Sequence, residues 1–355
     1  MKKLLTVLLA MSMVFCIFAC GEKEPSTYEI GMVTDIGTID DESFNQGTWE
    51  GVKAYGDAEN ITYKYYQPTA DTNDARMEQI DLAVKNGAKV VVTPGFLFEN
   101  VIFQAQEKYP DVTFLFIDGA PMNDDDPAKE VVGTNTVAIT FAEQEAGYYA
   151  GYAAVKDGYK KLGFMGGYSV PAVVRYGYGF VEGANAAANE MGLKDVEIKY
   201  NYTNSFEPSP DINAKAAGWY EGGTEVIFSC GGGIFASISA AAETAGAKVI
   251  GVDVDQSGKS ETVITSAMKN LGGAVEEILT SYYGGTFEGG KHLVLGSAED
   301  AVGIPMDTSV FTKFTKADYD KVYADVKAGK IKISTDADAK TVKGLDVSIK
   351  VKLVE

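Results

Sequence analysis

The chain has 355 residues, and its 50 acidic and 31 basic side chains give a formal net charge of −19. This length accommodates two ordinary domains, and so acidic a chain repels phosphate backbones, which excludes nucleic acid as a general partner. The single histidine, His292, excludes His-rich metal centres and leaves little room for a His-based triad, and two of the three cysteines lie within the first twenty residues, which excludes a disulfide framework.

The N-terminal segment has the pattern of an export signal. Lys2 and Lys3 precede a mostly apolar run over residues 4–18, which is too short to span a bilayer comfortably and fits a signal peptide. The end of this run, IFACG at 17–21, resembles a bacterial lipobox, which implies cleavage before Cys20 and attachment of diacylglycerol to its thiol. An ordinary signal peptide with a chance cysteine, or a core helix, is the alternative. We expect a lipoprotein signal peptide over residues 1–19, the lipidated Cys20 with a tether over residues 20–27, and a body that lies outside the cytoplasm, held on the cell membrane by its lipid anchor.

The next part of the chain alternates β-rich runs with amphipathic segments. Runs of β-branched and aromatic residues predict strands, and apolar residues at helical spacing predict helices. This alternation indicates a parallel sheet with helices on both faces. The expected strands span residues 28–34, 61–67, 89–93, 113–117 and 131–134, and the expected helices span residues 45–59, 74–86 and 99–109.

The same alternation starts again after a long helix predicted over residues 141–158. Two similar α/β halves suggest two lobes with a cleft between them, and open α/β sheets bind ligands at the carboxyl ends of their strands. The expected strands span residues 161–166, 196–202, 225–229, 248–252, 263–266, 292–295 and 347–353, and the expected helices span residues 178–191, 211–220, 235–245, 270–283 and 317–328.

No motif in the sequence supports a catalytic, metal or cofactor site. The stretch Gly258-Lys259-Ser260 lacks the glycine that a P-loop needs five residues before its second glycine, where Asp253 stands. Neither G-x-S-x-G nor H-E-x-x-H occurs. We therefore predict a protein that is not an enzyme and has no metal or cofactor, although counting carboxylates does not exclude a glycosidase-like pair.

The densest group of candidate binding residues follows the first expected strand. Asp35 stands at the carboxyl end of that strand, and Ser43 or Asp41 can cap the next helix. Phe44 and Asn45 then occupy the first turn of the helix, on a loop that faces the expected cleft. Phe44 either faces a ligand there or packs as a hydrophobic staple.

A second aromatic side chain, Phe206, follows a strand in the other half. Phe44 and Phe206, one from each half, form a sandwich for a flat ring. A planar heterocycle gains about 1–3 kcal/mol from each aromatic partner, by analogy with base stacking. The alternative is that Phe206 fills a small cluster of loop side chains.

Polar or small residues follow further strands. Asp118 and Asp253 each end a buried strand, where a carboxylate accepts hydrogen bonds from ribose hydroxyls or ring N–H groups. Gly231 and Gly232 let the backbone approach a ligand closely, and Lys269 places a cation after another strand, where it could balance Asp253. Each also has a plain interpretation, as a turn aspartate, a strand-to-helix turn or a surface lysine.

Five passages stand in this order in the chain: DIGTIDDESFNQ at 35–46, FIDG at 116–119, EAGYYAG at 145–151, GFMGG at 163–167 and GVDVDQ at 251–256. Together they resemble the basic membrane protein family of bacterial lipoproteins, which are purine nucleoside receptors of ABC importers. The ordered set is specific although no single passage is, and the resemblance covers about residues 28–310. Phe206 and Lys269 also fall where the pattern of the family expects them.

The resemblance implies a type I periplasmic-binding-protein fold, an α/β architecture of two doubly wound parallel-sheet lobes with a ligand cleft between them. The pattern of the family places Phe44 and Phe206 on the two faces of the base. It places Asn45 and Asp118 at the edge of the base, with help from Asp35.

By the same resemblance, Asp253 and Lys269, with the backbone at Gly231 and Gly232, would hold the ribose. The ligand would be a purine nucleoside such as inosine, guanosine or adenosine, and the partner would be an ABC transporter permease that recognises the closed receptor. We expect the ligand to bind one lobe first, and closure to bring Phe206, Asp253 and Lys269 onto it and expel water.

The crossovers between lobes are expected near residues 139–142, 264–268 and 296–303, so each lobe is discontinuous. Lobe one is predicted to comprise residues 28–139 plus 268–297, and lobe two residues 142–264 plus 303–355. Three other functions stay open at this point: a sugar receptor of the same fold, a surface nucleoside hydrolase, and an adhesin or surface antigen.

Overall fold

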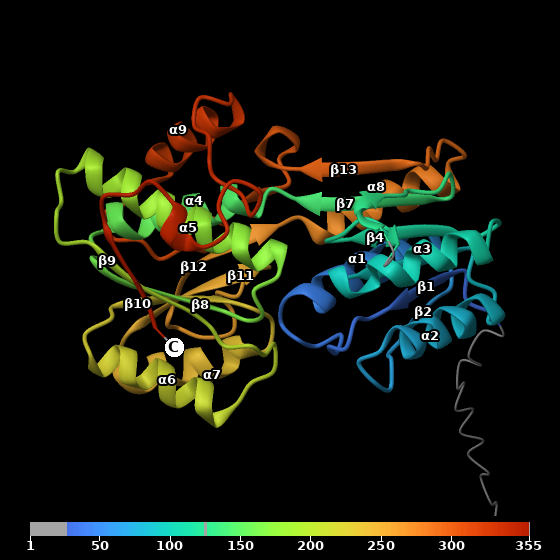
Figure 1. Cartoon of the computed structure of the whole chain (residues 1–355), viewed down its shortest axis with the longest axis horizontal. Helices are drawn as coiled ribbons and strands as arrows, with labels where there is room; N and C mark the ends of the chain where they lie inside the picture. The colour runs from blue at the N-terminus through green and yellow to red at the C-terminus, as the bar shows by residue number, and fades with distance from the viewer. Residues whose placement is uncertain (1–26, 124–125, 355) are drawn as a thin grey trace, which may run out of the picture.

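The computed structural model describes residues 27–123 and 126–354, in which two large sheets lie side by side, each covered by helices (Figure 1). The predicted signal peptide, Cys20 and all of the tether except Thr27 lie outside the described residues. Smaller elements are the antiparallel pair β5 (Met122–Asn123) and β6 (Asp126–Glu130) and the 3₁₀ turns η1 (Phe96–Phe98), η2 (Ser297–Glu299) and η3 (Val342–Gly344).

The first sheet has six strands in the order β13-β7-β4-β3-β1-β2, all parallel. Helices cover both faces, so its central strands are apolar along their length: in β4, Leu115 and Ile117 face the core under α1 and α8, and Phe114 and Phe116 face the core under α2 and α3. The elements are β1 (Ile30–Val33), β2 (Tyr63–Tyr66), β3 (Val90–Pro94), β4 (Thr113–Ile117), β7 (Thr136–Phe141), β13 (Lys291–Leu295), α1 (Phe44–Glu59), α2 (Asn73–Lys85), α3 (Glu99–Lys108) and α8 (Leu271–Tyr283).

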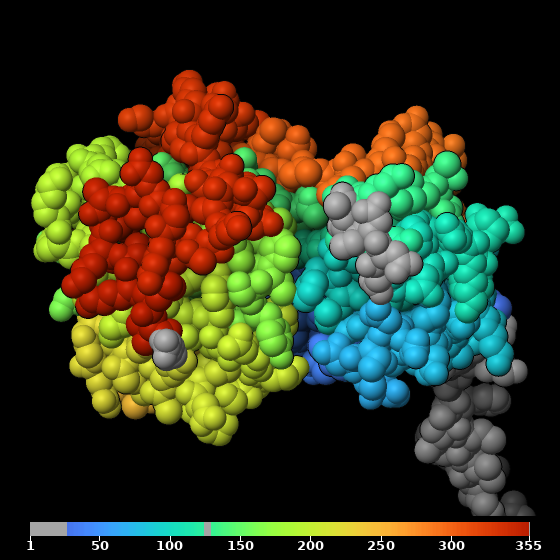
Figure 2. Space-filling model, in the orientation of Figure 1, coloured from blue at the N-terminus to red at the C-terminus, as the bar shows by residue number. Residues whose placement is uncertain are grey.

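The second sheet has the order β14-β12-β11-β10-β8-β9-β15, and all its strands are parallel except β14. Helices α4 and α5 cover one face, and α6 and α7 cover the other. The residues near the C-terminus, red in Figure 2, cross the outer surface of this half. The elements are β8 (Lys161–Gly166), β9 (Glu197–Tyr202), β10 (Val226–Cys230), β11 (Lys248–Asp253), β12 (Val263–Lys269), β14 (Val302–Gly303), β15 (Lys350–Leu353), α4 (Glu143–Asp157), α5 (Pro171–Glu190), α6 (Pro210–Glu221), α7 (Ile234–Ala245) and α9 (Lys316–Lys327).

The chain passes between the two sheets at three places, from β7 to α4, from β12 to α8 and from β13 to β14. Neither sheet is therefore built from one continuous stretch of chain. The two halves also repeat one topology: the orders β4-β3-β1-β2 and β11-β10-β8-β9 correspond strand by strand. This repetition matches the two similar α/β halves that the sequence predicts.

One predicted strand is wrong. Residues 131–134 form the connection between β6 and β7, and the strand itself begins at Thr136. The connection is held largely by a side chain of α3: Gln106 donates to the carbonyl of Val131 and accepts from the N–H of Gly133, both at 2.8 Å, while the N–H of Val131 donates to the carbonyl of Pro121 at 2.8 Å.

One predicted helix begins too late. The helix expected from residue 178 starts at Pro171, because proline lacks only an N–H that the first turn leaves unpaired anyway. Val173 and Val174 lie in this first part of the helix. Because β-branched side chains have a low helix propensity, the sequence alone does not predict a helix there.

Candidate ligand-binding cleft

A cavity of about 300 Å³ lies where the loops that follow the strands of both sheets meet. This size is at the lower end of the range for small-molecule sites in proteins. Figure 2 shows the division between the two halves of the molecule, in which this cavity lies. All the predicted ligand-binding residues line the same cavity: Asp35, Phe44, Asn45, Asp118, Phe206, Gly231, Gly232, Asp253 and Lys269.

The loop before α1 is held by Asp41. Its carboxylate accepts hydrogen bonds from the backbone N–H groups of Ser43, Asn45 and Gln46, each at 3.0 Å. Burial raises the pKa of Asp41 to about 6, although these hydrogen bonds lower it. Asp41 is therefore the cap of the helix, whereas Ser43 stands at the N-cap position without a capping bond.

Asn45 has a fixed orientation. Its amide nitrogen donates to Asp35 Oδ1 at 3.1 Å and to Asp41 Oδ2 at 3.2 Å. Both partners only accept, so the carbonyl oxygen Oδ1 must point elsewhere, and among the described residues this buried atom has no hydrogen-bond partner. An unpaired buried acceptor costs about 1–3 kcal/mol, so Asn45 favours a ligand that donates a hydrogen bond.

Asp118 offers a second acceptor of this kind. One carboxylate oxygen, Oδ2, accepts from Lys269, while the buried Oδ1 has no hydrogen-bond partner among the described residues. Burial raises the pKa of Asp118, and the negative charges of Glu143 and Asp253 act in the same direction against the lowering effect of Lys269. Asp118 and Asp253 both hold φ at 65°, a left-handed backbone at the end of β4 and β11. Non-glycine residues in this conformation gather at functional sites.

The two phenyl rings line the cavity from opposite halves of the molecule. Phe44 is half-buried, with its ring centre 4.6 Å from the ammonium of Lys269. Phe206 is half-buried as well, and its ring meets Tyr168 edge to face at 5.1 Å. Gly167 makes room for Phe206, because a Cβ there would overlap the ring. Of the two interpretations left open for Phe44, the structure favours the one that faces the cavity.

Gly231 and Gly232 form the turn between β10 and α7. Gly232 has φ at 53°, a left-handed conformation that suits glycine, and a Cβ at Gly231 would press on the backbone of Gly167. The turn therefore lets main chain, rather than side chains, form this wall of the cavity. A peptide group in this wall can reach a ligand directly.

Lys269 is buried, so its interpretation as a surface lysine is wrong. Its ammonium donates to Asp118 and lies 3.4 Å from Glu143 and 3.6 Å from Asp253. Burial lowers the pKa of Lys269, but the three carboxylates outweigh this effect and raise it, so the side chain stays charged.

Sequence reasoning missed Glu143 and Arg175. Glu143 is the first residue of α4, fully buried, and it accepts from Nε of Arg175 at 2.6 Å. Burial raises the pKa of Glu143, but Arg175 and Lys269 lower it more, so the carboxylate stays ionised. The one signal in the sequence is position, since Glu143 comes directly after the predicted crossover at 139–142, next to the apolar pair Phe141-Ala142.

Tyr176 is a further residue that the sequence did not single out. It lines the cavity and donates from its hydroxyl to Asp253 Oδ1 at 3.3 Å, while Ser43 donates to Asp253 Oδ2 at 2.6 Å. Both oxygens of this carboxylate are thus engaged. In the described part of the chain, no group of His, Cys, Asp and Glu side chains has the arrangement of a metal site.

The model of a protein family matches residues 29–336 of this chain, and the family is described as the PnrA-like (Bmp) substrate-binding proteins of ABC transporters. The chain belongs to this family. The members are substrate-binding proteins rather than a class of enzymes, and they act outside the cytoplasm in association with a membrane. In the part of the chain that the structure describes, no helix is long and apolar enough to cross a bilayer.

Named relatives of this PnrA-like protein agree with the predicted family. Basic membrane protein A of Borreliella burgdorferi is 32% identical over 311 residues, which cover 85% of this chain and 87% of that protein. The ABC transporter nucleoside-binding protein BmpA of Lactococcus lactis subsp. cremoris is 27% identical over 334 residues, covering 88% of this chain and 90% of that protein.

The solved structure of an ABC transporter solute-binding protein from Aeropyrum pernix K1 has the same fold as this PnrA-like chain. The TM-score is 0.75 at 21% identity, and the match covers 89% of this chain and 95% of the other. Together with the two helix-covered sheets, this match confirms the predicted type I periplasmic-binding-protein fold.

Proposed function

We propose that this protein is a lipid-anchored receptor that captures purine nucleosides in the interlobe cavity and delivers them to an ABC importer. The observation that carries the proposal is the lining of the cavity, where Phe44 and Phe206 from different lobes stand beside the unpaired acceptors of Asn45 and Asp118. A flat ring that carries N–H donors satisfies both features at once. The name of the Lactococcus relative, a nucleoside-binding protein, supports this ligand class.

In this proposal the base lies between Phe44 and Phe206. The free acceptors of Asn45 and Asp118 take hydrogen bonds from its edge, and Asp35 acts through Asn45, whose amide it holds. Specificity then comes from directed hydrogen bonds, because a buried acceptor without its donor carries the full cost of lost hydration.

The ribose lies toward Asp253 and Lys269, with the peptide groups of Gly231 and Gly232 in reach. Asp253 sits at the end of β11 and Lys269 at the end of β12, so neighbouring strands of the second sheet present both charges. Closure of the lobes brings these groups together with the Phe44 loop and excludes water, which strengthens each hydrogen bond. The closed form is the one that the permease would recognise.

We expect calorimetry on the soluble form, residues 21–355, refolded after denaturation to remove carried-over ligand, to show tight binding of inosine, guanosine or adenosine. Phe44→Ala should weaken the affinity about tenfold to a hundredfold, because one stacking partner is lost. Asp253→Asn should weaken it further while the chain stays folded. Unchanged affinity in both variants would contradict the assigned site.

The same titrations separate the remaining functions. Strong competition by free ribose would indicate a sugar receptor, and release of free base from the bound nucleoside would indicate a hydrolase. Absence of binding by the wild-type protein to every nucleoside would overturn the proposal, while the fold would stand.

A further inference from the structure

Two loops from different lobes bond to one another beside the cavity. Gln256 Nε2 in lobe two donates to the backbone carbonyl of Glu42 in lobe one at 2.8 Å. The hydroxyl of Ser43 donates to Asp253 Oδ2 at 2.6 Å, and Lys259 pairs with the Glu42 carboxylate at 3.1 Å. We call these three contacts, made by Glu42, Ser43, Asp253, Gln256 and Lys259, the interlobe latch.

Gln256 is fixed within its own lobe before it reaches across. Its side chain is fully buried, and its Oε1 accepts from the N–H of Val252 at 2.9 Å. Its backbone N–H donates to the hydroxyl of Ser266 at 3.0 Å. The oxygen of the amide is thereby committed, so the NH₂ group is directed at Glu42. A side chain held on two sides in this way loses little conformational entropy when it forms the bond across the lobes.

The partner of Gln256 is equally well placed. Glu42 holds φ at 58°, and its carbonyl shares a planar peptide group with the N–H of Ser43, which donates to Asp41 Oδ1 at 3.0 Å and so sets the direction of the carbonyl. Ser43 and Phe44 follow directly in the chain. The bond from Gln256 to Glu42 therefore ties the loop that carries Phe44 to the strand end that carries Asp253.

The three contacts are not equivalent in energy. The Lys259–Glu42 pair leaves both side chains 38% exposed, and such pairs contribute little because water and salt screen them. The amide of Gln256 is buried, so losing its partner while the lobes stay closed leaves a desolvated donor unpaired, which is costly. When the lobes separate, water can reach both groups.

We infer that Gln256 is a positioning residue that holds the closed state of the receptor through the backbone carbonyl of Glu42, and so sets how long a ligand stays bound. This inference rests on the proposed function for the identity of the ligand, but closure itself is measurable without one. It also implies that the latch stabilises closure in the ligand-free protein, since every group in it belongs to the chain.

The sharpest variant is Gln256→Glu, which keeps an acceptor for the N–H of Val252 and, at neutral pH, replaces the donor that faces Glu42 with a charged oxygen that only accepts. At pH 7.5 we expect the dissociation rate of guanosine from the soluble form, residues 21–355, measured by stopped flow, to rise about tenfold or more, with the association rate within about twofold of wild type. Near pH 5 the introduced carboxyl protonates and can donate to the same carbonyl. The ratio of variant to wild-type dissociation rates should therefore fall, which a purely structural role would not produce.

Three further variants control this experiment. Gln256→Met fills the same volume without a donor and should also speed dissociation. Lys259→Ala should change the dissociation rate by less than about twofold. Gln104→Ala alters an exposed glutamine on α3, which lies outside the latch, and should change nothing.

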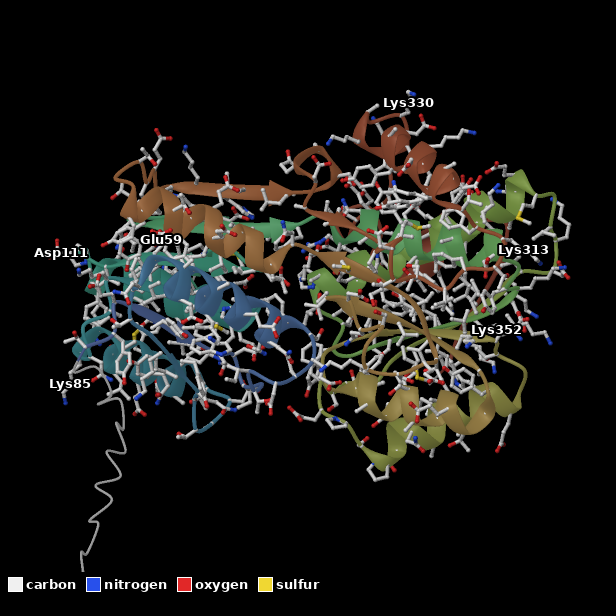
Figure 3. The ribbon with its side chains drawn as sticks, turned by 180° about the vertical axis from the view of Figure 1, so that it is seen from behind. Glu59, Lys85, Asp111, Lys313, Lys330 and Lys352 are labelled. Carbon is white, nitrogen blue, oxygen red and sulfur yellow. The ribbon has the colours of Figure 1, made fainter. Side chains whose placement is uncertain are left out.

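Closure is tested separately by energy transfer between dyes at Lys85→Cys in lobe one and Lys330→Cys in lobe two, two exposed positions on different halves of the molecule (Figure 3). The one cysteine in the described part of the chain, Cys230, is buried. Without ligand, Gln256→Glu should shift the distance distribution toward open forms. Unchanged distributions together with unchanged dissociation rates in both Gln256 variants would overturn the inference. If the wild-type protein bound no nucleoside, the proposed function would fail, and the ligand-free distributions alone would decide the latch.

Discussion

Lys269 contacts three carboxylates that come from three separate stretches of the chain, at Asp118, Glu143 and Asp253. With Arg175 on Glu143, this buried cluster holds two cations and three carboxylates, which gives a formal charge of −1. Removing Lys269 would leave Arg175 alone against three buried carboxylates, which is a costly excess of negative charge. Its charge also disfavours an anionic group in the cavity, which agrees with an uncharged nucleoside as the ligand.

We expect the proposed nucleoside binding to depend on pH through Asp41. Because burial raises the pKa of Asp41 to about 6, we expect the affinity for guanosine to hold from pH 8 to 7 and to fall below about pH 6, as protonation removes an acceptor that fixes Asn45. Calorimetry over a pH series checks this. In Asp41→Asn the pH step should shrink to the part that Asp118 contributes, since the pKa of Asp118 is also raised.

The raised pKa of Asp41 affects folding stability in the opposite direction: a falling pH weakens binding but favours the folded chain. A carboxyl with a higher pKa in the folded than in the unfolded chain binds protons preferentially when folded. Its contribution to the free energy of unfolding is therefore complete below its ordinary pKa of 3.8 and is lost as the pH rises through about 6. Binding should weaken between pH 7 and 5 without loss of thermal stability from Asp41. A parallel fall of both, absent from Asp41→Asn, would contradict this assignment.

The pair of helices α4 and α5 shows how an element positions the site. Gly147 and Gly151 on α4 face Gly179 and Gly183 on α5, and a Cβ at any of them would overlap a carbonyl oxygen of the opposite helix. The backbones can approach this closely only because side chains are absent. Their approach places the start of α4, with Glu143, beside Arg175 in the first part of α5.

Gly179→Ala should separate the two helices. We expect the free energy of unfolding, measured by urea denaturation, to fall by about 1–3 kcal/mol, as for other overpacked cores. Nucleoside affinity should fall as well, because the Glu143–Arg175 contact shifts. The matched control is Gly218→Ala on α6, where a Cβ meets no atom within 4 Å. That variant should gain about 0.5–1 kcal/mol from helix propensity, and equal effects of the two substitutions would contradict the role of close packing.

The sequence predicts the ends of a strand correctly where residues typical of turns stand on both sides of it. The strands over Thr113–Ile117 and Lys161–Gly166 have the predicted ends, because each is a short β-rich run bounded by turn residues. The strand at Thr136–Phe141 was missed, since a helix was expected to begin at its last residue. Here the tertiary pairing with β4 and β13 decides the structure, and no local pattern reports it.

For the site, sequence reasoning found the residues that follow strands, and the structure gathers all of them around one cavity. It missed Arg175 and Tyr176, because both lie inside a helix whose start was predicted too late. The partners of these side chains, Glu143 and Asp253, stand far away in the chain. Only the folded molecule brings them together.

On the scale of the whole molecule, the predicted lipid anchor determines where the protein is located and takes no part in ligand binding. We expect Cys20→Ser to move the protein from the membrane fraction to the soluble fraction of the cell envelope, since the thiol that carries the lipid is gone. The affinity of the purified protein for nucleosides should be unchanged, because the cavity lies entirely within residues 35–269. Membrane retention of the variant at the wild-type level would contradict lipidation at Cys20.

The three passages of the chain between the sheets also determine when the protein can fold. The first sheet is incomplete until β13 has joined β7, and the core under α1 is open until α8 covers it. Both elements lie beyond residue 270, after five of the seven strands of the second sheet. Pairings this distant in sequence form slowly. During the predicted export, the segment that starts the first lobe is therefore outside the cytoplasm before its own last strand has followed. A chain that ends before residue 291 lacks β13, so its first lobe is incomplete and the cavity has no finished partner lobe to close against.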